Sequence, residues 1–486
     1  MFASEKYSLA LFKELKYRIV CSYQNARGYK MSDLYSIILA AGEGKRMKSN
    51  IAKPLQIAAG KPLAEWVADT ATAAGSVENI MVVGHKAEDV KEYFGDRVTY
   101  RYQYEQLGTG HAVMQGIDAI SSKEGTVVVL YGDAPLIEAD VLKAAYAQHM
   151  SENAAATVIT AVVDEPFGYG RIVRENGSIA KIVEQKDASD EQKLIKEVNS
   201  GMYFFDIQKL LGALKRVTND NAQGEYYITD VIEILLGDGE KVGVYITGED
   251  QILGVNDRLQ LAQVSKILYM RKNKQVMLDG VTVIDPDATY IGADVKIGRD
   301  TVIYPNTSLD GKTEIGENCA IGPDTNLTNC TIGNNTEVIK TVGIESAVGE
   351  KTHVGPFAYL RPGSRIGGDV KIGDFVEIKN SFVGDGTKVS HLTYIGDADV
   401  GKRVNFGCGT VVVNYDGHSK HRSVIEDDCF IGCNTNLVSP VLVRKGAYTA
   451  AGSTITKEVP ENSLAIARSR EVIKQDWVAK KEKEQK

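Results

Sequence analysis

The sequence of 486 residues has few cysteines, no long apolar run and no excess of positive charge. Its six cysteines show neither a disulfide framework nor the CxxC spacing of a zinc site, which favours a reduced, cytoplasmic protein. No run approaches the roughly 20 apolar residues of a membrane span, so we expect no membrane insertion. The formal net charge of −8 argues against nucleic acid as the main partner.

The first half of the chain alternates between strand and helix patterns. Apolar strands are expected at 35–39, 80–83, 127–131, 156–163 and 201–205, with helices at 63–74 and 139–149 between them. This alternation indicates a doubly wound, Rossmann-like α/β domain that ends near Gly254. One long helix, rich in Leu, Gln, Lys and Arg, is expected next at 257–277.

The second half repeats with a period of six. From about Ile291 to Ile455 an aliphatic residue returns every six positions, often with a glycine directly after it. This period fits neither a helix nor a single strand, but it fits a parallel β-helix whose aliphatic residues point inward. We expect coils of about eighteen residues, about nine coils in all, and glycines that ease the turns at the corners.

These hexads resemble the left-handed β-helix of the hexapeptide-repeat acyltransferases. The resemblance implies a trimer with binding sites in the clefts between neighbouring subunits. A glycine-rich all-β domain with chance spacing is the alternative, and the constant register of so many repeats disfavours it.

The patterns divide the chain into five parts: 1–30, a leader or extension; 31–256, the α/β domain; 257–280, a helical linker; 281–470, the β-helix; and 471–486, a polar tail. Arg27-Gly28 stands shortly before Met31, and codons for Arg-Gly can spell a bacterial ribosome-binding site. We therefore expect translation to start at Met31 and 1–30 to be translated leader, with a native helical extension as the alternative.

A glycine-containing loop with basic residues follows the first expected strand, in LAAGEGKRM at 39–47. Gly42 and Gly44 allow close backbone approach, and a loop that enters a helix offers free N–H groups to phosphates. Arg46 and Lys53 add positive charge for a triphosphate. The loop matches neither the Walker A nor the GxGxxG pattern, so its spacing alone predicts only phosphate binding.

Together with KPL at 53–55, the loop resembles the signature of the nucleoside-diphosphate-sugar pyrophosphorylases. The resemblance extends to QYEQLGTGHA at 103–112, the base-reading segment of that family, where Gln103 or Gln106 is expected to pair with uracil. The residues that it implies for binding UTP and the UDP-sugar are Leu39, Ala40, Ala41, Gly42, Lys53, Gln103, Gly108, Thr109, Tyr131, Gly132, Asp133, Gly170, Glu184, Asn199 and Asn256.

Asp133 stands directly after an apolar strand, at the sheet edge where α/β proteins bind ligands. Its carboxylate suits Mg²⁺, and a turn or helix-capping aspartate is the alternative. The resemblance adds Asn256 as a second metal ligand and implies in-line attack of a sugar 1-phosphate on the α-phosphorus of UTP. Arg46 and Lys53 are then the catalytic cations that neutralise the charge on the phosphates.

His391 lies among the hexads, in HLTYIGDA at 391–398, and Arg361 and Lys379 precede it on successive coils. The hexads break between 413 and 424, which predicts an excursion loop, and such loops commonly carry function. The set resembles the active site of the glucosamine-1-phosphate acetyltransferases, in which His391 would be the general base that deprotonates the amine. A corner or surface histidine is the alternative.

The same resemblance implies the remaining contacts. The sugar phosphate is expected at Arg361, Lys379, Tyr394 and Asn405. Acetyl-CoA is expected at Cys408, Asn414, Tyr415, Cys433, Ala451 and Arg468. His418 and His421 do not predict zinc, because no third ligand is evident. No role is predicted for His85, His111, His149 and His353.

Over about 34–470 the chain resembles the bacterial bifunctional enzymes that combine uridyltransferase and acetyltransferase domains. The resemblance implies acetylation of glucosamine 1-phosphate by acetyl-CoA at 281–470, then coupling of N-acetylglucosamine 1-phosphate to UTP at 31–256. We expect a cytoplasmic homotrimer that supplies UDP-N-acetylglucosamine for peptidoglycan. Two alternatives stay open: a single-activity sugar-1-phosphate nucleotidyltransferase with a structural β-helix, and a non-enzymatic β-helix scaffold.

Overall fold

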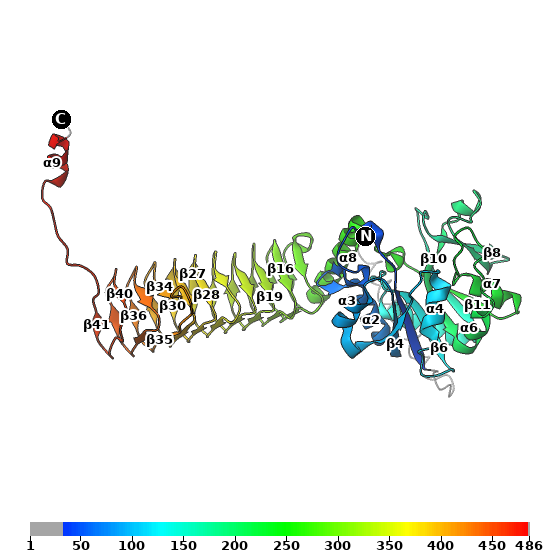
Figure 1. Cartoon of the computed structure of the whole chain (residues 1–486), viewed down its shortest axis with the longest axis horizontal. Coiled ribbons are helices and arrows are strands. Elements are labelled where there is room, and N and C mark those ends of the chain that lie inside the picture. The colour runs from blue at the N-terminus through cyan, green and yellow to red at the C-terminus, as the bar shows by residue number, and fades with distance from the viewer. Residues whose placement is uncertain (1–32, 485–486) are drawn as a thin grey trace, which may run out of the picture. The chain divides into compact units, whose positions relative to one another are not determined.

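The computed structural model describes residues 33–484, and it divides the chain into two compact units (Figure 1). Within the described residues, unit 1 comprises 33–55 together with Leu63–Asn256. Unit 2 comprises Gln56–Pro62 and 257–484. The leader predicted at 1–30 lies outside the described residues.

Unit 1 contains a nine-stranded mixed sheet. Its main path runs β11 (Val242–Thr247), β7 (Ala156–Val162), β10 (Glu197–Asp206), β6 (Thr126–Tyr131), β1 (Leu34–Ala40), β4 (Ser76–Val83) and β5 (Thr99–Tyr102), with β8 (Gly170–Glu175) and β9 (Ser178–Val183) attached at β10. β1 pairs in parallel with β4 and β6, whereas β10 pairs antiparallel with β6 and β7. The predicted α/β class is confirmed, and β10 makes the sheet mixed.

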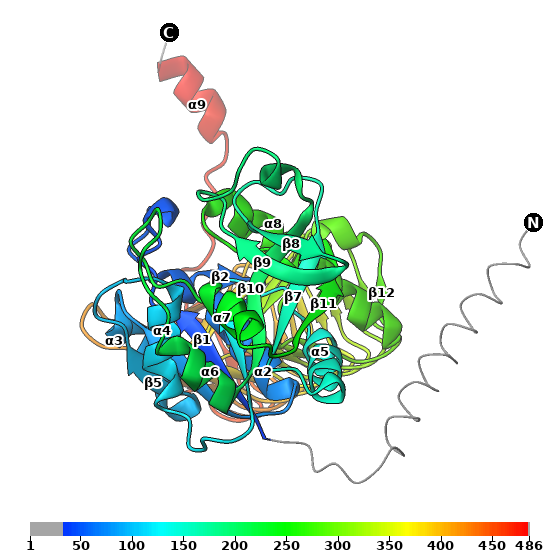
Figure 2. The same cartoon turned by 90° about the vertical axis from the view of Figure 1, so that its right-hand side faces the viewer.

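Helices cover both faces of this sheet (Figure 2). Successive side chains of β1 point to opposite faces, so Ile38 joins one apolar cluster and Ile37 the other. The first cluster includes α2 (Leu63–Ala73), α3 (Ala87–Phe94) and α5 (Ala139–Glu152); the second includes α4 (Thr109–Ile117), α6 (Ile207–Leu214) and α7 (Asp230–Gly237). A strand buried on both faces reads as a continuous apolar run, which is why β1 was predictable.

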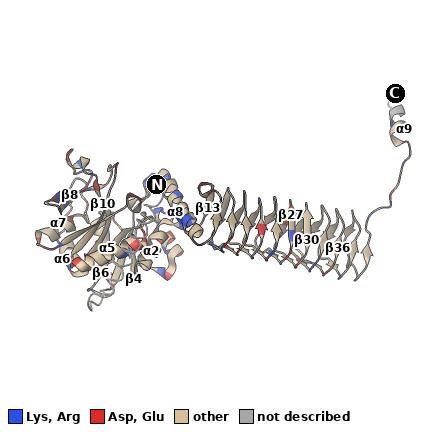
Figure 3. Cartoon of the chain, turned by 180° about the vertical axis from the view of Figure 1, so that it is seen from behind, with Lys and Arg blue, Asp and Glu red and all other residues tan. Residues whose placement is uncertain are grey.

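Unit 2 begins with α8 (Arg258–Leu278), whose basic residues are blue in Figure 3. The side chain of Asp257 accepts a hydrogen bond from the Gln260 N–H at 2.9 Å and caps this helix. A hairpin of β2 (Ile57–Ala58) and β3 (Lys61–Pro62) also belongs to unit 2. The Ala59 carbonyl at its turn accepts from the Ala293 N–H at 3.2 Å, so this distant segment of the sequence packs on the first coil.

The rest of unit 2 is a parallel β-helix of three strand stacks (Figure 1). The first stack is β12 (Thr282–Val283), β15 (Val302–Ile303), β18 (Ala320–Ile321), β21 (Glu337–Val338), β24 (His353–Val354), β27 (Lys371–Asp374), β30 (Lys388–His391), β33 (Asn405–Phe406), β36 (Phe430–Ile431), β39 (Tyr448–Thr449) and β41 (Leu464–Ala465). The second is β13 (Thr289–Ile291), β16 (Thr307–Asp310), β19 (Asn326–Thr328), β22 (Val342–Ile344), β25 (Tyr359–Leu360), β28 (Glu377–Lys379), β31 (Tyr394–Gly396), β34 (Val411–Val413), β37 (Asn436–Val438) and β40 (Thr454–Ile455). The third is β14 (Lys296–Ile297), β17 (Glu314–Ile315), β20 (Thr331–Ile332), β23 (Ala347–Val348), β26 (Arg365–Ile366), β29 (Phe382–Val383), β32 (Ala398–Val400), β35 (Ser423–Ile425) and β38 (Leu442–Val443). The left-handed sense of the coil stays a prediction, and α9 (Trp477–Glu484) closes the described chain.

The aliphatic residues of the hexads form the core of the β-helix, as predicted. Val354, Ile372 and Val389 follow one another in the first stack and expose no surface. One inward position is held by Gly343, where an added Cβ would lie 2.8 Å from Leu327 Cδ2. The six-residue aliphatic pattern lapses after Leu327 for two reasons: Gly343 holds one inward position, and the steps from Leu327 to Ile332, from Val338 to Gly343 and from Gly343 to Val348 are one residue shorter than six.

The role predicted for the glycines that follow these residues is wrong at most positions. Gly298, Gly349 and Gly384 do not adopt positive φ angles. They are needed because an added Cβ would lie 2.6–2.7 Å from the backbone of the next coil. The corners instead carry residues with positive φ, among them Asp300, Asn306, Asn318, Asp324 and Asn335, because Asn and Asp tolerate the left-handed region.

The close approach at Gly349 can be tested with a pair of alanine variants. Gly349→Ala places a Cβ 2.6 Å from the Gly367 carbonyl carbon, whereas Gly368→Ala places one 3.3 Å from the Glu350 carbonyl oxygen. We expect Gly349→Ala to destabilise unit 2 by about 1–3 kcal/mol and Gly368→Ala to cost much less. Differential scanning calorimetry of the full chain measures both, and equal shifts in the two variants would contradict the coil-contact explanation.

Candidate functional site

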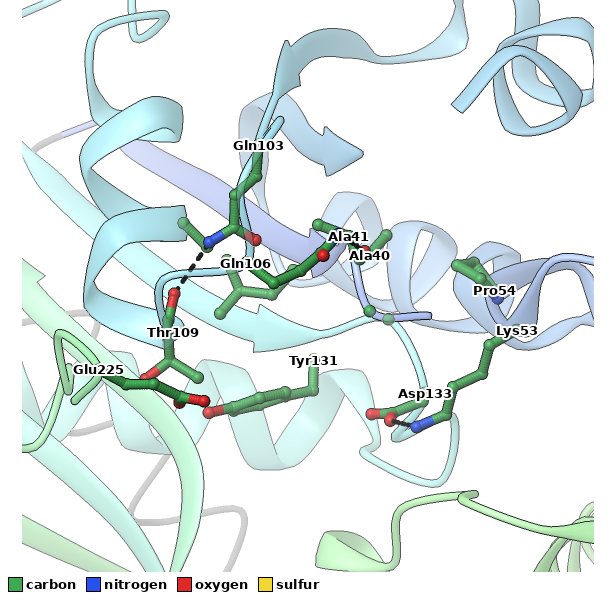
Figure 4. A pocket seen from close by; sticks show the side chains of 15 residues that line it. Ala40, Ala41, Lys53, Pro54, Gln103, Gln106, Thr109, Tyr131, Asp133 and Glu225 are labelled. Carbon is green, nitrogen blue, oxygen red and sulfur yellow. Dashed lines mark hydrogen bonds and ion pairs between the residues drawn. The ribbon is translucent and has the colours of Figure 1, made fainter. Parts of the chain in front are cut away.

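A cavity of about 250 Å³ opens at the carboxyl ends of β1 and β6 (Figure 4). The residues that line it are Leu39, Ala40, Ala41, Gly42, Lys53, Pro54, Gln103, Gln106, Gly108, Thr109, Ala112, Tyr131, Gly132, Asp133 and Glu225. Of the residues predicted to bind UTP and the sugar, only Gly170, Glu184, Asn199 and Asn256 are not among them. Glu225 was not predicted, because it comes from a polar segment far along the chain.

Lys53 joins the two predicted metal ligands. Its ammonium forms an ion pair with the Asp133 carboxylate and donates to Asn256 Oδ1 at 2.9 Å. The Val255 N–H donates to the Asp133 carbonyl at 2.8 Å, which holds the segment before α8 against the end of β6. Two hard oxygen donors therefore converge on one cation, and Mg²⁺ is commonly held in proteins by one or two such ligands together with phosphate oxygens and water.

A second cavity of about 210 Å³ adjoins Lys53 and is formed by the loop after β1. Arg46 lines this cavity rather than the first, on the short 3₁₀ helix Lys45–Met47. Gly44 precedes that helix with a φ of 64°, and an added Cβ would lie 2.8 Å from Lys53 Cβ. Only glycine fits at this position without strain. Gly44 therefore allows the loop to pack against Lys53, so that Arg46 and Lys53 line the same cavity.

Three predicted sugar-binding residues lie close together: Gly170 on β8, Asn199 on β10 and Glu184 directly after β9. Asn199 pairs with Gly170 across the strands, and a Cβ on Gly170 would lie 3.6 Å from Glu184 Oε1. Burial raises the pKa of Glu184. Burial and then the charge of Glu184 raise the pKa of Tyr131, which lines the first cavity. Tyr131 therefore connects this group with the cavity.

In unit 2 the strand register places His391 in a corner row with residues of other coils. Asp374 pairs with His391 directly. On the following coils, Val389 pairs with Phe406, Phe406 with Ile431 and Ile431 with Thr449. The residues two positions after these paired residues therefore continue the row that contains His391. The row, called here the histidine row, consists of Asp374, His391, Cys408, Cys433 and Ala451. Arg468 lies next to its end, 3.7 Å from where a Gly452 Cβ would stand.

Asp374 orients the imidazole of His391. His391 Nδ1 and Asp374 Oδ1 are 2.6 Å apart, and both side chains are exposed. The hydrogen bond from His391 lowers the pKa of Asp374, so the carboxylate is ionised and accepts the Nδ1 proton. In a neutral imidazole this leaves Nε2 as the acceptor. The geometry suits a general base.

Three cations of unit 2 lie close to one another. The ammonium of Lys379 lowers the pKa of Lys420, and the charge of Arg361 contributes in the same direction. Lys379 Nζ lies 3.5 Å from Asp397 Oδ2, and Arg361 Nη1 donates to Glu377 at 2.7 Å. Lys420 was not predicted, although it lies in the predicted excursion loop.

The predicted polar contacts fall into two groups. Asn414 Nδ2 donates to Asp397 Oδ2 at 2.5 Å and to Tyr394 Oη at 3.4 Å, which places both residues beside Lys379. Tyr415 is exposed on the excursion loop. Asn405 lies on β33, and within residues 33–484 its side chain forms no hydrogen bond.

The two histidines of the excursion loop form hydrogen bonds within that loop. Asp416 accepts from the backbone N–H groups of His418 and Ser419, and its other oxygen lies 2.6 Å from His421 Nε2. Across the described part of the chain, no three His, Cys, Asp or Glu side chains group in a way that could hold a metal ion.

None of the helices between residues 33 and 484 combines the length and the apolarity needed to cross a membrane.

Comparison with known proteins extends the similarity over nearly the whole chain. Residues 35–251 match the nucleotidyl transferase family. The bifunctional protein GlmU of Acetivibrio thermocellus is 57% identical over 453 residues, which cover 93% of this chain and 98% of that protein. The GlmU proteins of Caldanaerobacter subterraneus and Halalkalibacterium halodurans are 53% and 51% identical, over 92% and 93% of this chain and 98% and 100% of their own lengths.

Asp230, at the start of α7, gives unit 1 a pH dependence. Burial, then the charges of Glu233 and Asp187, raise its pKa from 3.8 to about 6. The folded state therefore holds this proton more tightly than the unfolded state, and stability falls as pH rises from about 4 to about 6. We expect Asp230→Asn to stabilise unit 1 on the order of 1 kcal/mol at pH 7.5 and less at pH 4.5.

Urea unfolding followed by Trp66 fluorescence in a Trp477→Phe background reports on unit 1 alone, because these are the two tryptophans of the chain. The exposed Glu175→Gln serves as a control. The same gain for Asp230→Asn at both pH values would show that the carboxyl does not titrate as described.

Proposed function

The chain belongs to the family of bifunctional GlmU proteins, and on this premise we propose that its two units carry two successive reactions of UDP-N-acetylglucosamine synthesis. The protein is a bifunctional transferase. It N-acetylates glucosamine 1-phosphate with acetyl-CoA, and it transfers a uridylyl group from UTP to N-acetylglucosamine 1-phosphate with release of pyrophosphate. We assign uridylyl transfer to 31–256, acetyl transfer to 281–470 and a linking role to α8. The nucleotide sugar serves cell-wall synthesis, and we place the enzyme in the cytoplasm with its co-substrates.

The contacts of Asp133 and Asn256 with the Lys53 ammonium support the assignment of uridylyl transfer to unit 1. Asp133 and Asn256 would hold Mg²⁺, which supplies charge neutralisation at the phosphates. An oxygen of the sugar phosphate attacks the α-phosphorus of UTP, and the bond from that phosphorus to the bridging oxygen of the β-phosphate breaks. Lys53 and Arg46 neutralise the negative charge on the departing pyrophosphate. No side-chain nucleophile is required, because the attacking oxygen is already anionic.

Gln103 is our choice between the two candidate base readers. Its side chain is part of the cavity wall and only 4% exposed, whereas Gln106 is exposed. Gly108 beside it has a φ of 106°, and an added Cβ would lie 2.6 Å from the Tyr226 carbonyl oxygen. A side chain at position 108 would therefore displace the segment that contains Glu225 and Tyr226, and Glu225 is part of the cavity wall. Gly170, Glu184 and Asn199 hold the sugar.

The histidine row supports the acetyl-transfer assignment. Cys408, Cys433 and Ala451 follow His391 along one corner, so a cofactor bound along the row, with Asn414, Tyr415 and Arg468, would end with its thioester at His391. The amine attacks the thioester carbonyl, the carbon–sulfur bond breaks and coenzyme A leaves as the thiol. His391 Nε2 accepts the proton that the amine loses and gives it to the departing thiolate.

The phosphate of glucosamine 1-phosphate needs cationic partners near His391. Arg361, Lys379 and Lys420 supply three positive charges close to one another. Tyr394 and Asn405 then position the sugar ring. A structural β-helix has no need for such a cluster, which favours the bifunctional reading over a single-activity nucleotidyltransferase.

An exposed apolar corner supports a homotrimer. Phe357, Phe375 and Leu392 are 52%, 57% and 56% exposed, and all three have positive φ angles. The two phenylalanine rings stack at 5.3 Å, and Leu392 continues their row beside His391. Exposed apolar patches of this kind commonly mark protein interfaces. We propose that neighbouring subunits cover this corner and complete the acetyltransferase site, including hydrogen-bond partners for the Asn405 side chain, which has none among residues 33–484.

His391→Ala separates the two activities. We expect acetyl transfer to fall by about 10²–10⁴-fold, because a general base contributes that much, while pyrophosphate release from UTP and N-acetylglucosamine 1-phosphate stays unchanged. Thiol release from acetyl-CoA measures the first reaction. His353→Ala is the matched control, since His353 is a partly exposed β-helix histidine outside the site. Loss of both activities in a folded His391→Ala protein would contradict two independent sites.

Phe375→Asp tests the trimer. A charge beside Phe357 and Leu392 should prevent a neighbouring subunit from packing on this corner. We therefore expect a shift from trimer to monomer in light scattering, and loss of acetyl transfer while uridylyl transfer is kept. Phe382→Asp, which changes an exposed aromatic residue of the third stack, serves as the control. A Phe375→Asp protein that stays trimeric and fully active would remove this corner from the interface.

A further inference from the structure

Gln103, the residue assigned to read the base, is held by two acceptors. Its Nε2 lies 2.9 Å from the Gly108 carbonyl oxygen and 3.2 Å from His111 Nδ1. In Figure 4 a dashed hydrogen bond starts from this amide nitrogen of Gln103, and the amide oxygen is turned away from it. Within residues 33–484 the oxygen, Oε1, has no hydrogen-bond partner, and the residue lines the cavity.

The Gly108 carbonyl determines which end of the amide faces it. A carbonyl oxygen only accepts hydrogen bonds, so the Gln103 atom beside it is the nitrogen. Both N–H groups of that nitrogen are then used, one on Gly108 and one on His111. His111 Nδ1 must therefore be an acceptor, which puts the proton of the neutral imidazole on Nε2.

Gln115 sets this tautomer from the other side of the ring. Its carboxamide lies one helical turn after His111 on α4, with its nitrogen 3.3 Å from His111 Nε2. A neutral imidazole cannot accept at both nitrogens. Because Gly108 already determines the Gln103 end, we infer that the Gln115 carboxamide turns its oxygen to the Nε2 proton.

We propose that His111 is a positioning residue that determines the choice of pyrimidine. Supported by Gln115, it holds the Gln103 amide so that Oε1, and no donor, faces the nucleotide. The proposal rests on the proposed function, because it concerns the base-reading role assigned to Gln103.

The chemistry of the two pyrimidines explains the effect. Uracil carries an N–H donor at ring position 3, which Oε1 accepts. Cytosine carries a lone pair at the same position, so Oε1 would meet a second acceptor. A site whose buried polar group is left unpaired by the wrong ligand discriminates strongly against that ligand. Without the acceptor at His111 the amide is held by the Gly108 carbonyl alone, so it turns more readily and offers its N–H groups to cytosine.

His111→Phe tests this with the full-length enzyme. The phenyl ring keeps the bulk of the imidazole, whose centroid lies 6.4 Å from that of the Tyr226 ring, but it provides no acceptor. Steady-state pyrophosphate release is measured with UTP and with CTP. We expect kcat/KM for UTP to fall about tenfold, chiefly through KM, and kcat/KM for CTP to fall less. KM for N-acetylglucosamine 1-phosphate should stay unchanged.

Two further variants keep the test decisive. Gln115→Leu removes the acceptor for the Nε2 proton, and we expect the UTP-to-CTP preference to narrow in the same direction. Gln115→Glu retains an acceptor oxygen and should keep the preference. His353→Phe is the control for a histidine-to-phenylalanine change, and urea unfolding followed by Trp66 fluorescence in the Trp477→Phe background reports whether unit 1 of each protein is folded.

An unchanged UTP-to-CTP ratio in folded His111→Phe, or an equal loss for both nucleotides, overturns the proposal. If His111→Phe does not fold, the ratio in Gln115→Leu decides in the same way. A wild-type enzyme that does not prefer UTP over CTP would instead overturn the base-reading assignment of Gln103, and with it the proposed function of the cavity.

Discussion

The structure of unit 2 depends on one constraint, the in-register stacking of successive coils. Each short strand pairs in parallel with the strand one coil away, so a residue's neighbours in space are set by its position within the coil. This keeps the aliphatic residues inside and forces glycine wherever one coil meets the backbone of the next. The same constraint lines up His391 with Asp374 and with cysteines further along the chain. Because the excursion loop enters and leaves between paired strands, it adds Lys420 to the site without disturbing the register.

Unit 1 brings its chemistry together differently, at the edge of a sheet. Loops after β1 and β6 and the segment before α8 meet at Lys53, whose ammonium links Asp133 and Asn256. No repeat dictates this arrangement; the Val255–Asp133 backbone hydrogen bond and the tight turn at Gly44 do. The two units therefore hold two separate sites: strand pairing between successive coils arranges the site of unit 2, and loops that meet at the sheet edge arrange the site of unit 1. That separation is what permits one substitution to remove one activity alone.

Periodic features were predictable from the sequence, and single contacts were not. The buried strands of unit 1 and the inward residues of the hexads follow from local apolar patterns. The 56–62 hairpin, Lys420 and Asp374 were missed because their importance depends on contacts between segments far apart in sequence. The glycines were assigned the wrong cause, since a hexad shows that glycine is required but not whether a turn or a neighbouring backbone requires it. His111 belongs to no pattern that predicts a role, and its importance depends on the position of its Nδ1 beside Gln103.

The central claim is that one chain performs acetyl transfer and then uridylyl transfer at two sites. The most direct measurement is pyrophosphate release from UTP and Mg²⁺ with glucosamine 1-phosphate as acceptor, with and without acetyl-CoA. N-acetylglucosamine 1-phosphate is run beside it as the acceptor that needs no acetylation. We predict release from glucosamine 1-phosphate only when acetyl-CoA is present. Release from the acetylated sugar alone, whatever is added, would contradict the claim and leave the β-helix as a scaffold for a single-activity nucleotidyltransferase.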